Sequence, residues 1–115
     1  MNASPMIEKK QFKMFSDAVR EPYANFLLEE VNDHCLRLAV MEEAYQWHYH
    51  EKTDELFIVL EGQLMIEFRD APAIILSPGE FIKLPARTIH KTSAIGRTVN
   101  LCFEKTGTDT IFLEE

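Results

Sequence analysis

Three histidines and one glutamate have the residue types and the spacing of a metal site. His48 and His50 are separated by one residue in the stretch WHYHEKTDELFIVLEG, Glu55 follows shortly after, and His90 lies further along the chain. Side chains two positions apart in a β-strand point to the same face, so His48 and His50 would project together. Imidazole and carboxylate are common ligands of divalent transition metals. These four residues predict one metal site with three nitrogen ligands and one anionic oxygen ligand.

The segments that must position these residues have the pattern of short β-strands. From residue 25 onward, short apolar runs recur at nearly even spacing, and turn pairs such as Asn32-Asp33 and Glu61-Gly62 separate them. Nine or ten strands are expected: two within residues 25–41, and the others at 45–50, 55–60, 63–69, 73–76, 81–84, 89–92, 99–103 and 110–113. The absence of any long helical pattern after residue 24 predicts an all-β fold, an antiparallel sandwich or barrel.

The beginning of the chain has a different pattern. Pro5 and Pro22 bracket a polar stretch in which Phe12, Phe15 and Val19 recur at roughly helical spacing, which predicts one short helix. We therefore expect an N-terminal segment over residues 1–24 that is partly helical, followed by one barrel domain over residues 25–115. The sequence gives no sign of an internal repeat or of a second domain.

The spacing of these residues resembles that of a small single-domain cupin. The two motifs of that family are commonly written G-x5-H-x-H-x3/4-E-x6-G and G-x5-P-x-G-x2-H-x3-N. Seven residues match them: His48, His50, Glu55 and Gly62 in the first motif, and Gly79, Pro85 and His90 in the second. Three positions depart from them, all in turns or flanks and none a ligand: Glu42, Arg87 and Ala94.

The resemblance implies the jelly-roll barrel of the cupins, an antiparallel double-stranded β-helix, with a divalent metal held inside by the four candidate ligands. The alternative interpretation is that the histidines are ordinary core or surface residues in a barrel that has lost its metal. His34 follows the predicted turn at Asn32-Asp33, and we expect it at the surface and not among the ligands.

Strand parity also predicts which other side chains share the face of the ligands. Four residues are candidates for a substrate pocket: Gln46, Phe57, Thr88 and Thr92. The alternative for each is ordinary filling of the barrel. Lys83 and Arg87 either meet an anionic substrate at the mouth of the barrel or are simply solvated.

The residues that alternate with His48 and His50 are large and aromatic. Tyr45, Trp47 and Tyr49 are expected to point out of the barrel as an apolar patch of the kind found at interfaces. Either the N-terminal segment covers this patch, or the patch forms a homodimer. The resemblance to small cupins, which often form homodimers, favours the second interpretation.

The composition restricts the classes of partner. The 115 residues carry 19 acidic and 12 basic side chains, a formal net charge of −7, and no basic cluster, which argues against nucleic acid and anionic membrane surfaces. No apolar run has the length of a signal peptide core or a membrane span, and we expect a cytoplasmic protein. Cys35 and Cys102 form no CxxC pair and are expected to be reduced and buried.

Three imidazoles and one carboxylate would leave one or two positions open on an ion that takes five or six ligands, as catalytic metals require. The ligand types suit Fe(II), Mn(II), Zn(II), Ni(II) or Co(II), and the sequence does not choose among them. A redox metal would suit a cupin dioxygenase, and a non-redox metal a cupin isomerase or decarboxylase acting on a sugar or keto acid. The alternative is a non-enzymatic module that binds or senses a small molecule through the metal. The sequence identifies neither a substrate nor a catalytic residue besides the ligands.

Overall fold

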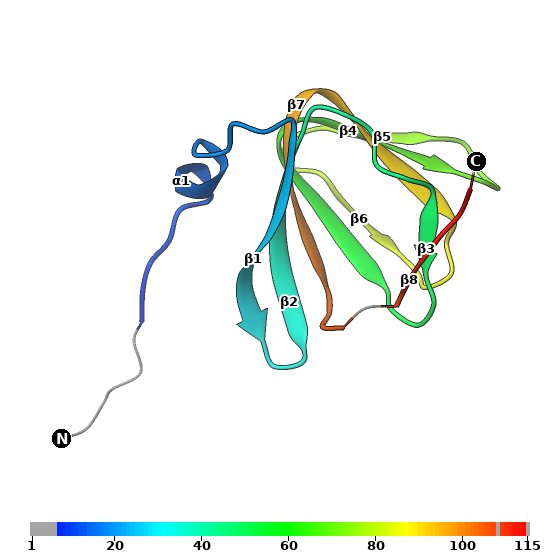
Figure 1. Ribbon diagram of the computed structural model, residues 1–115, viewed down its shortest axis with the longest axis horizontal. Coiled ribbons are helices and arrows are strands. Elements are labelled where there is room, and N and C mark those ends of the chain that lie inside the picture. The colour runs from blue at the N-terminus through cyan, green and yellow to red at the C-terminus, as the bar shows by residue number, and fades with distance from the viewer. Residues whose placement is uncertain (1–6, 108, 115) are drawn as a thin grey trace.

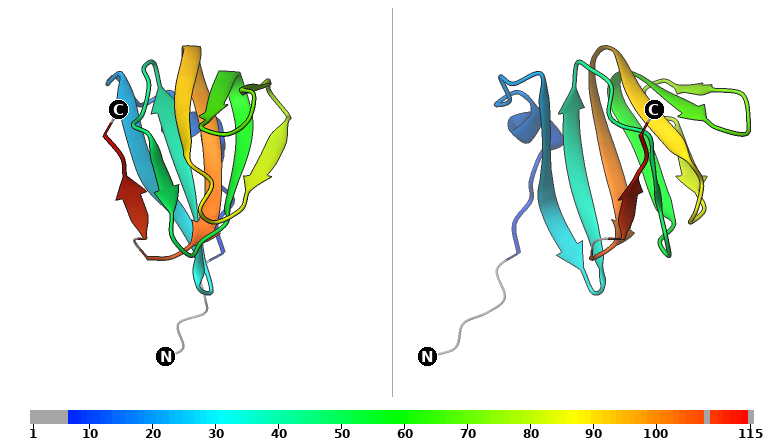
Figure 2. Two further views of the ribbon diagram at one scale, coloured as in Figure 1. Left: turned by 90° about the vertical axis from the view of Figure 1, so that its right-hand side faces the viewer. Right: turned by 45° about the vertical axis from the view of Figure 1, so that its right-hand side comes forward.

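The computed structural model describes residues 7–107 and 109–114, which form one short helix and eight β-strands (Figure 1). The helix α1 is Phe12–Ser16, and the strands are β1 (Tyr23–Val31), β2 (His34–Met41), β3 (His48–His50), β4 (Glu55–Phe68), β5 (Ile74–Leu76), β6 (Phe81–Leu84), β7 (His90–Lys105) and β8 (Thr110–Phe112). The strands pair antiparallel in one sheet that curls into a barrel, as the two further views in Figure 2 show. The predicted all-β jelly-roll class is confirmed. Residues 1–6 of the predicted N-terminal segment lie outside the described residues.

Two long strands form the centre of the barrel. β4 pairs with β7 from Glu55↔Glu104 to Phe68↔His90, and the register shifts on either side of Glu61. β7 also pairs with β2, and β4 pairs with β5 and β6. The prediction of nine or ten strands was therefore wrong, because residues 55–60 and 63–69 belong to one strand and residues 89–92 and 99–103 to another. A bulge interrupts the alternation of a strand without ending its ladder, which explains the error.

Gly62 lies in this bulge and has a conformation that other residues rarely adopt. Its φ is +76°, and an added Cβ would lie 2.4 Å from the carbonyl oxygen of Arg97 on the neighbouring strand. Thr98 of β7 connects the two strands beside this bulge. Its hydroxyl accepts a hydrogen bond from the Gln63 amide at 3.2 Å and donates one to the Gln63 carbonyl at 2.8 Å. A residue without a Cβ therefore lets β4 bend against β7 at close approach.

Alternation along the strands separates two apolar clusters. The inner cluster lies on the inner face of the strands, and its most buried members are Val59, Leu64, Ile66 and Leu84. The outer cluster lies on the opposite face of β2 and β7, and its buried members are Leu38, Val40, Val99 and Leu101. Each fully buried side chain of this size contributes about 1.5–3 kcal/mol. β2 and β7 are therefore buried on both faces over much of their length.

The N-terminal helix packs against the outer face of the sheet, beside β1 and β2 (Figure 1). The rings of Phe15 and Phe26 lie 6.3 Å apart, and Val19 packs against the outer cluster. Arg97 donates a hydrogen bond to the Ser16 carbonyl at 2.7 Å. The predicted helix is therefore present, and it covers an apolar face. Among the described residues, no helix is long and apolar enough to cross a membrane.

Replacing Gly62 with alanine is expected to destabilise the metal-free protein by more than ~2 kcal/mol, because the substitution adds backbone strain and a clash with the Arg97 carbonyl. Gly79→Ala is the matched control. Gly79 has a φ of +89° but no atom within 4 Å of an added Cβ, so only the conformational cost of about 1 kcal/mol is expected. Urea unfolding in excess chelator measures both values. An equal decrease of the free energy of unfolding in the two variants would contradict the close approach of the strands at Gly62.

Candidate metal centre

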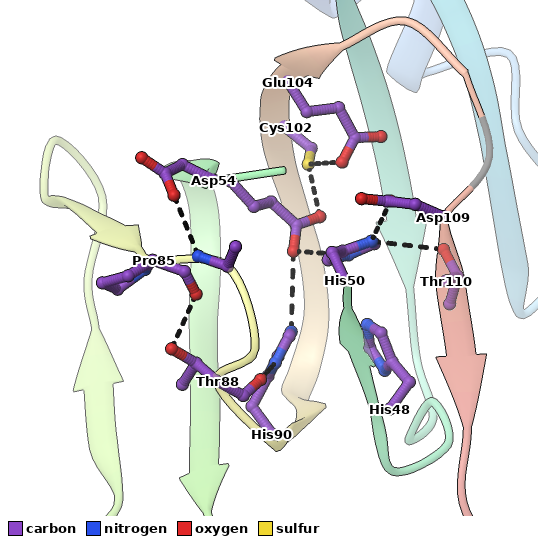
Figure 3. A network of polar contacts seen from close by, with 12 residues as sticks. His48, His50, Asp54, Pro85, Thr88, His90, Cys102, Glu104, Asp109 and Thr110 are labelled. Carbon is purple, nitrogen blue, oxygen red and sulfur yellow. Dashed lines mark hydrogen bonds and ion pairs between the residues drawn. The ribbon is translucent and has the colours of Figure 1, made fainter. Parts of the chain in front are cut away.

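The four candidate ligands lie together inside the barrel. His48 and His50 are on β3, Glu55 begins β4, and His90 begins β7. One ligand atom from each residue lies within 4.8 Å of the other three. Figure 3 shows the imidazoles of His50 and His90 directed toward the same region of the barrel interior. The exposed fractions are 5%, 9%, 7% and 1% in chain order, so all four polar side chains are buried.

Strand pairing brings these residues together. His48 pairs directly with His90 across β3 and β7, and His90 pairs with Phe68 at the end of β4. Within β3, His48 and His50 point inward and Tyr49 outward, as the period of two predicts. Each ligand therefore has a backbone position that is fixed by a neighbouring strand.

Two loop contacts hold the segments just before Glu55 and His90. The Ala86 amide donates to Asp54 Oδ1 at 2.9 Å (Figure 3). The Arg87 amide donates to the His50 carbonyl at 2.7 Å. Arg87 stands where the cupin motif has glycine, yet its φ is +69°. The chain keeps the left-handed conformation despite the substitution, at a cost of about 1–2 kcal/mol.

Each histidine uses its Nδ1 atom for a contact outside the cluster. Nδ1 of His48 lies 2.8 Å from the Gln46 carbonyl oxygen, and Nδ1 of His90 lies 2.8 Å from the Thr88 carbonyl oxygen. A carbonyl only accepts, so both Nδ1 atoms carry a proton, and in the neutral imidazole this leaves the lone pair on Nε2. Nδ1 of His50 is within 3.3 Å of Asp109 Oδ1 and 3.2 Å of Thr110 Oγ1. Such outer contacts orient the histidines of metal sites.

The two oxygens of Glu55 have different surroundings. Oε2 accepts a hydrogen bond from the Cys102 thiol at 2.8 Å. Oε1 lies at ion-pair distance from both imidazoles, 3.0 Å from Nε2 of His50 and 3.5 Å from Nε2 of His90. These three atoms are buried and have no hydrogen-bond partner among the described residues. Buried polar atoms are almost always satisfied, so two imidazole nitrogens and one carboxylate oxygen around a common point fit a bound cation.

Burial and charge shift the pKa values of the cluster in opposite directions. Burial lowers the pKa of His48 to about 4, so its imidazole is neutral at pH 7. Burial also disfavours protonated His50, but the Glu55 carboxylate outweighs this effect and raises the pKa of His50 to about 9. Burial would raise the pKa of Glu55, but His50 and His90 hold it well below its usual range. In the metal-free protein a proton on His50 therefore balances Glu55, and a bound ion would replace that proton.

The cluster opens into a cavity of about 140 Å³ inside the barrel. Of the residues predicted to line a pocket, Phe57 and Thr92 lie in its wall, whereas Gln46 and Thr88 do not. Gln46 is exposed because β3 begins only at His48, so strand parity does not reach residue 46. Thr88 precedes β7 and donates its hydroxyl to the Pro85 carbonyl at 2.7 Å. The prediction from strand alternation was therefore wrong for Gln46 and Thr88, because neither residue lies in a strand.

The prediction of an outward aromatic patch was wrong for Tyr45. This residue lies before β3 and lines the cavity, where its ring stacks on Tyr23 at 5.8 Å and meets the His48 ring edge-on at 5.2 Å. Trp47 lies under the guanidinium of Arg69, 5.3 Å from the ring centre. The predicted homodimer relied on this patch, so it loses part of its support and stays a prediction.

Sequence reasoning missed several polar residues of the cavity wall. Six of them are Asn25, Arg37, Asn100, Cys102, Glu104 and Thr110. Unbroken alternation from His90 along β7 would have placed the three even-numbered β7 residues on the inner face, but β7 had been divided into two strands. Of the two interpretations of Lys83 and Arg87, the structure favours the solvated one. Lys83 forms a surface ion pair with Asp54 at 3.9 Å, and Arg87 forms one with Glu51 at 3.5 Å.

The free cysteines are both buried, as predicted. Cys102 lies between two carboxyl groups, with Sγ 2.8 Å from Glu55 Oε2 and 3.9 Å from Glu104 Oε1. Burial and the charge of Glu55 raise the pKa of Cys102 well above its ordinary value. Cys102 is therefore a neutral thiol that holds Glu55 in place. His34 is at the surface of the hairpin, 2.9 Å from Asp33 Oδ1.

A comparison with protein families matches residues 36–103 to the cupin domain. The chain belongs to the cupin family. The barrel, the inward β3 histidines and the pairing of His48 with His90 are thus features of a cupin domain.

Relatives of this cupin are found among both sequences and structures. The chain is 44% identical over 110 residues to "Uncharacterized protein YdbB" of Bacillus subtilis (strain 168), covering 96% of this chain and 97% of that protein. A crystal structure of a cupin-2 domain containing protein from Shewanella frigidimarina is 32% identical with a TM-score of 0.79, covering 84% of this chain and 94% of that one. A stretch of 43 residues is 46% identical to quercetin 2,3-dioxygenase of Bacillus subtilis (strain 168), which is 37% of this chain but only 12% of the dioxygenase.

Glu104→Gln is expected to stabilise the metal-free cupin at pH 8 and to leave it unchanged at pH 4. Burial and the charge of Glu55 raise the pKa of Glu104 to about 7. A carboxyl group whose pKa is raised by folding does not lower the stability of the fold while it is protonated. The stability falls as the pH rises above the pKa of the unfolded state, and the full loss is reached above the pKa of the folded state. The gain at pH 8 should be about 1 kcal/mol after allowance for solvent screening of a partly exposed group.

Urea unfolding of wild type and variant at both pH values, in excess chelator, measures this difference. Glu80→Gln is the control, because Glu80 is an exposed carboxylate outside the cavity. A Glu104→Gln variant that is less stable than the wild type at pH 8 would contradict the destabilising effect of ionised Glu104.

Proposed function

We propose that this cupin binds one divalent metal ion through Nε2 of His48, His50 and His90 and Oε1 of Glu55, and that it is a metalloenzyme acting on a small molecule. The observation that carries the proposal is a set of three buried atoms that find no hydrogen-bond partner in the part of the chain that the structure describes: Nε2 of His50, Nε2 of His90 and Oε1 of Glu55. Protonation of His50 satisfies the charge but not the geometry, whereas an ion between these atoms satisfies both.

The residues around the site have distinct roles in this proposal. The carbonyl oxygens of Gln46 and Thr88 hold two imidazoles in the ligand tautomer, and Cys102 holds the second oxygen of Glu55. A bound ion would supply Lewis-acid or redox chemistry next to the cavity that His48, His50 and Glu55 line. The rings of Tyr45 and Phe57 make part of the cavity wall apolar, which excludes water beside the reacting molecule.

An oxygen-dependent reaction is the first class to test. The short similarity to quercetin 2,3-dioxygenase supports this order, and the 3-His/1-Glu ligand set suits Fe(II), Mn(II), Ni(II) or Co(II) as well as Zn(II). A non-redox ion would instead support isomerisation or decarboxylation of a sugar or keto acid. The competing function is a module that binds or senses a small molecule without converting it.

His90→Ala is expected to weaken metal binding by roughly 100-fold or more, because loss of a ligand exceeds the cost of losing an outer contact. The matched control is His34→Ala, which removes a histidine that is not among the clustered ligands and should bind metal as the wild type does. Elemental analysis of untagged protein and competition with a coloured chelator measure the affinity. Equal binding by the two variants would contradict the proposed ligand set.

Removal of the ion is expected to lower the melting temperature of the wild type. A ligand that binds only the folded state stabilises it by about 2.7 kcal/mol at a free concentration 100 times its Kd. Thermal melts of metal-loaded and chelator-treated wild type measure the shift, and His90→Ala should show almost none. A wild-type melt that does not change after verified metal removal would argue against a tight site.

Turnover separates the enzyme from the binding module. Protein loaded with Fe(II) or Mn(II) is expected to consume O₂ with a chelating substrate, and Zn(II)-loaded protein to convert a sugar or keto acid if the reaction is non-redox. An oxygen electrode and product analysis over a substrate panel measure the rates, with His90→Ala as the inactive control. Saturable binding without product from any substrate would favour the binding module.

A further inference from the structure

One cationic side chain lines the same cavity as the candidate ligands. Arg37 lies on β2, on the inner face that it shares with Ala39 and Met41, and not among the outer-face residues that form the outer cluster. Arg37 lines the cavity and is only partly buried, so its side chain is in contact with solvent as well. Lys83 and Arg87, for which the sequence left a place at the mouth or in solvent open, are outside the cavity wall.

The guanidinium of Arg37 is oriented by a hydrogen bond from its Nε atom. Nε donates to Asn25 Oδ1 at 2.7 Å, and Asn25 Nδ2 in turn donates to the Tyr23 hydroxyl at 3.3 Å. Within residues 7–107 and 109–114, the two terminal nitrogens of Arg37 make no hydrogen bond or ion pair. A guanidinium that is fixed through Nε and open at its terminal nitrogens presents the planar fork that binds a carboxylate with two hydrogen bonds.

Arg37 is close to the candidate metal centre through a short series of contacts. It lies directly opposite Cys102 in the antiparallel pairing of β2 with β7. Residues opposite each other in such a pair have Cβ atoms about 4.5–5.5 Å apart. Cys102 then contacts the ligand Glu55 at 2.8 Å. A small molecule in the 140 Å³ cavity can therefore reach the guanidinium at one end and the metal at the other.

The charges that line the cavity favour an anion once the metal is bound. The acidic residues of the wall are Glu55 and Glu104, and its cationic residue is Arg37. With a divalent ion among neutral imidazoles, positive charge exceeds negative charge by at least one. The protein as a whole carries −7, so this cavity would have the opposite sign to the rest of the surface.

We propose that the molecule bound in the cavity is a small organic acid, whose carboxylate pairs with Arg37 while a second oxygen group reaches the metal. This inference rests on the proposed function, because it places the metal at the other end of the acid. Tyr23, Tyr45 and Phe57 supply the apolar wall for the short carbon chain between the two groups. Arg37 is thus a residue that determines specificity for the acid and has no part in holding the metal.

The test is calorimetric titration of Zn²⁺-loaded protein with acetate, malonate, succinate and inorganic phosphate. The wild type is expected to bind at least one dicarboxylate more tightly than acetate, because two ends are engaged. Arg37→Gln should weaken that binding at least tenfold, since a charge-assisted bidentate contact is lost. The affinity of Arg37→Lys for the dicarboxylate should lie between those of the wild type and Arg37→Gln, because lysine keeps the positive charge but lacks the planar fork of the guanidinium.

Arg20→Gln is the matched control, because it removes one positive charge from an exposed residue outside the cavity. It should change dicarboxylate binding by less than about twofold at physiological salt. Zinc content and melting temperature of every variant are measured alongside. Arg37→Gln should hold zinc as the wild type does, which separates loss of acid binding from loss of the site or the fold.

The outcomes distinguish the two proposals. A wild type that binds no zinc overturns the proposed function and, with it, this inference. A wild type that holds zinc but binds no dicarboxylate, or an Arg37→Gln variant that binds dicarboxylate as tightly as the wild type, overturns the inference alone. Phosphate that binds more tightly than every carboxylate also overturns it, because the ligand would then be a phosphate compound.

Discussion

The burial of one carboxylate inside a β-barrel is the constraint on which the rest of this structure depends. Glu55 is 7% exposed, and a buried carboxylate without partners costs several kcal/mol. Two imidazoles, of His50 and His90, approach one of its oxygens, and the Cys102 thiol donates to the other. These three partners come from β3 and both ends of β7. The site therefore exists only when the distant pairings of the barrel have formed, and its polar groups depend on the complete fold.

That dependence explains why the two central strands are long and irregular. β7 carries His90 at its beginning and Cys102 near its end, and both must face Glu55. A straight strand would separate its ends by far more than the width of a metal site, so β4 and β7 bend together around the cavity. The bulge beside Gly62 supplies this bend, and the left-handed backbone at Arg87 turns the chain into His90.

The same irregularity sets the limit of what the sequence could predict. A period of two placed His48 and His50 correctly, because β3 is regular where they lie. The same period failed for Gln46, which lies before the strand. It also failed for the inner residues of β7, because the irregular pairing of β7 with β4 made one strand look like two in the sequence. The role of Arg37 could not be predicted from any motif. Its place in the cavity follows from which face of β2 turns inward, and tertiary pairing with β7 decides that face.

A polar cavity weakens a barrel from within, and the outer cluster offsets this weakness. Four residues that alternate with the polar wall on β2 and β7 are at most 5% exposed on the opposite face: Leu38, Val40, Val99 and Leu101. The helix α1 and Val19 help to cover that face. Apolar burial outside the barrel therefore holds the two strands in register while their inner positions carry charge. This division allows the inner residues to be chosen for chemistry, because the stability of these strands is supplied on the other side.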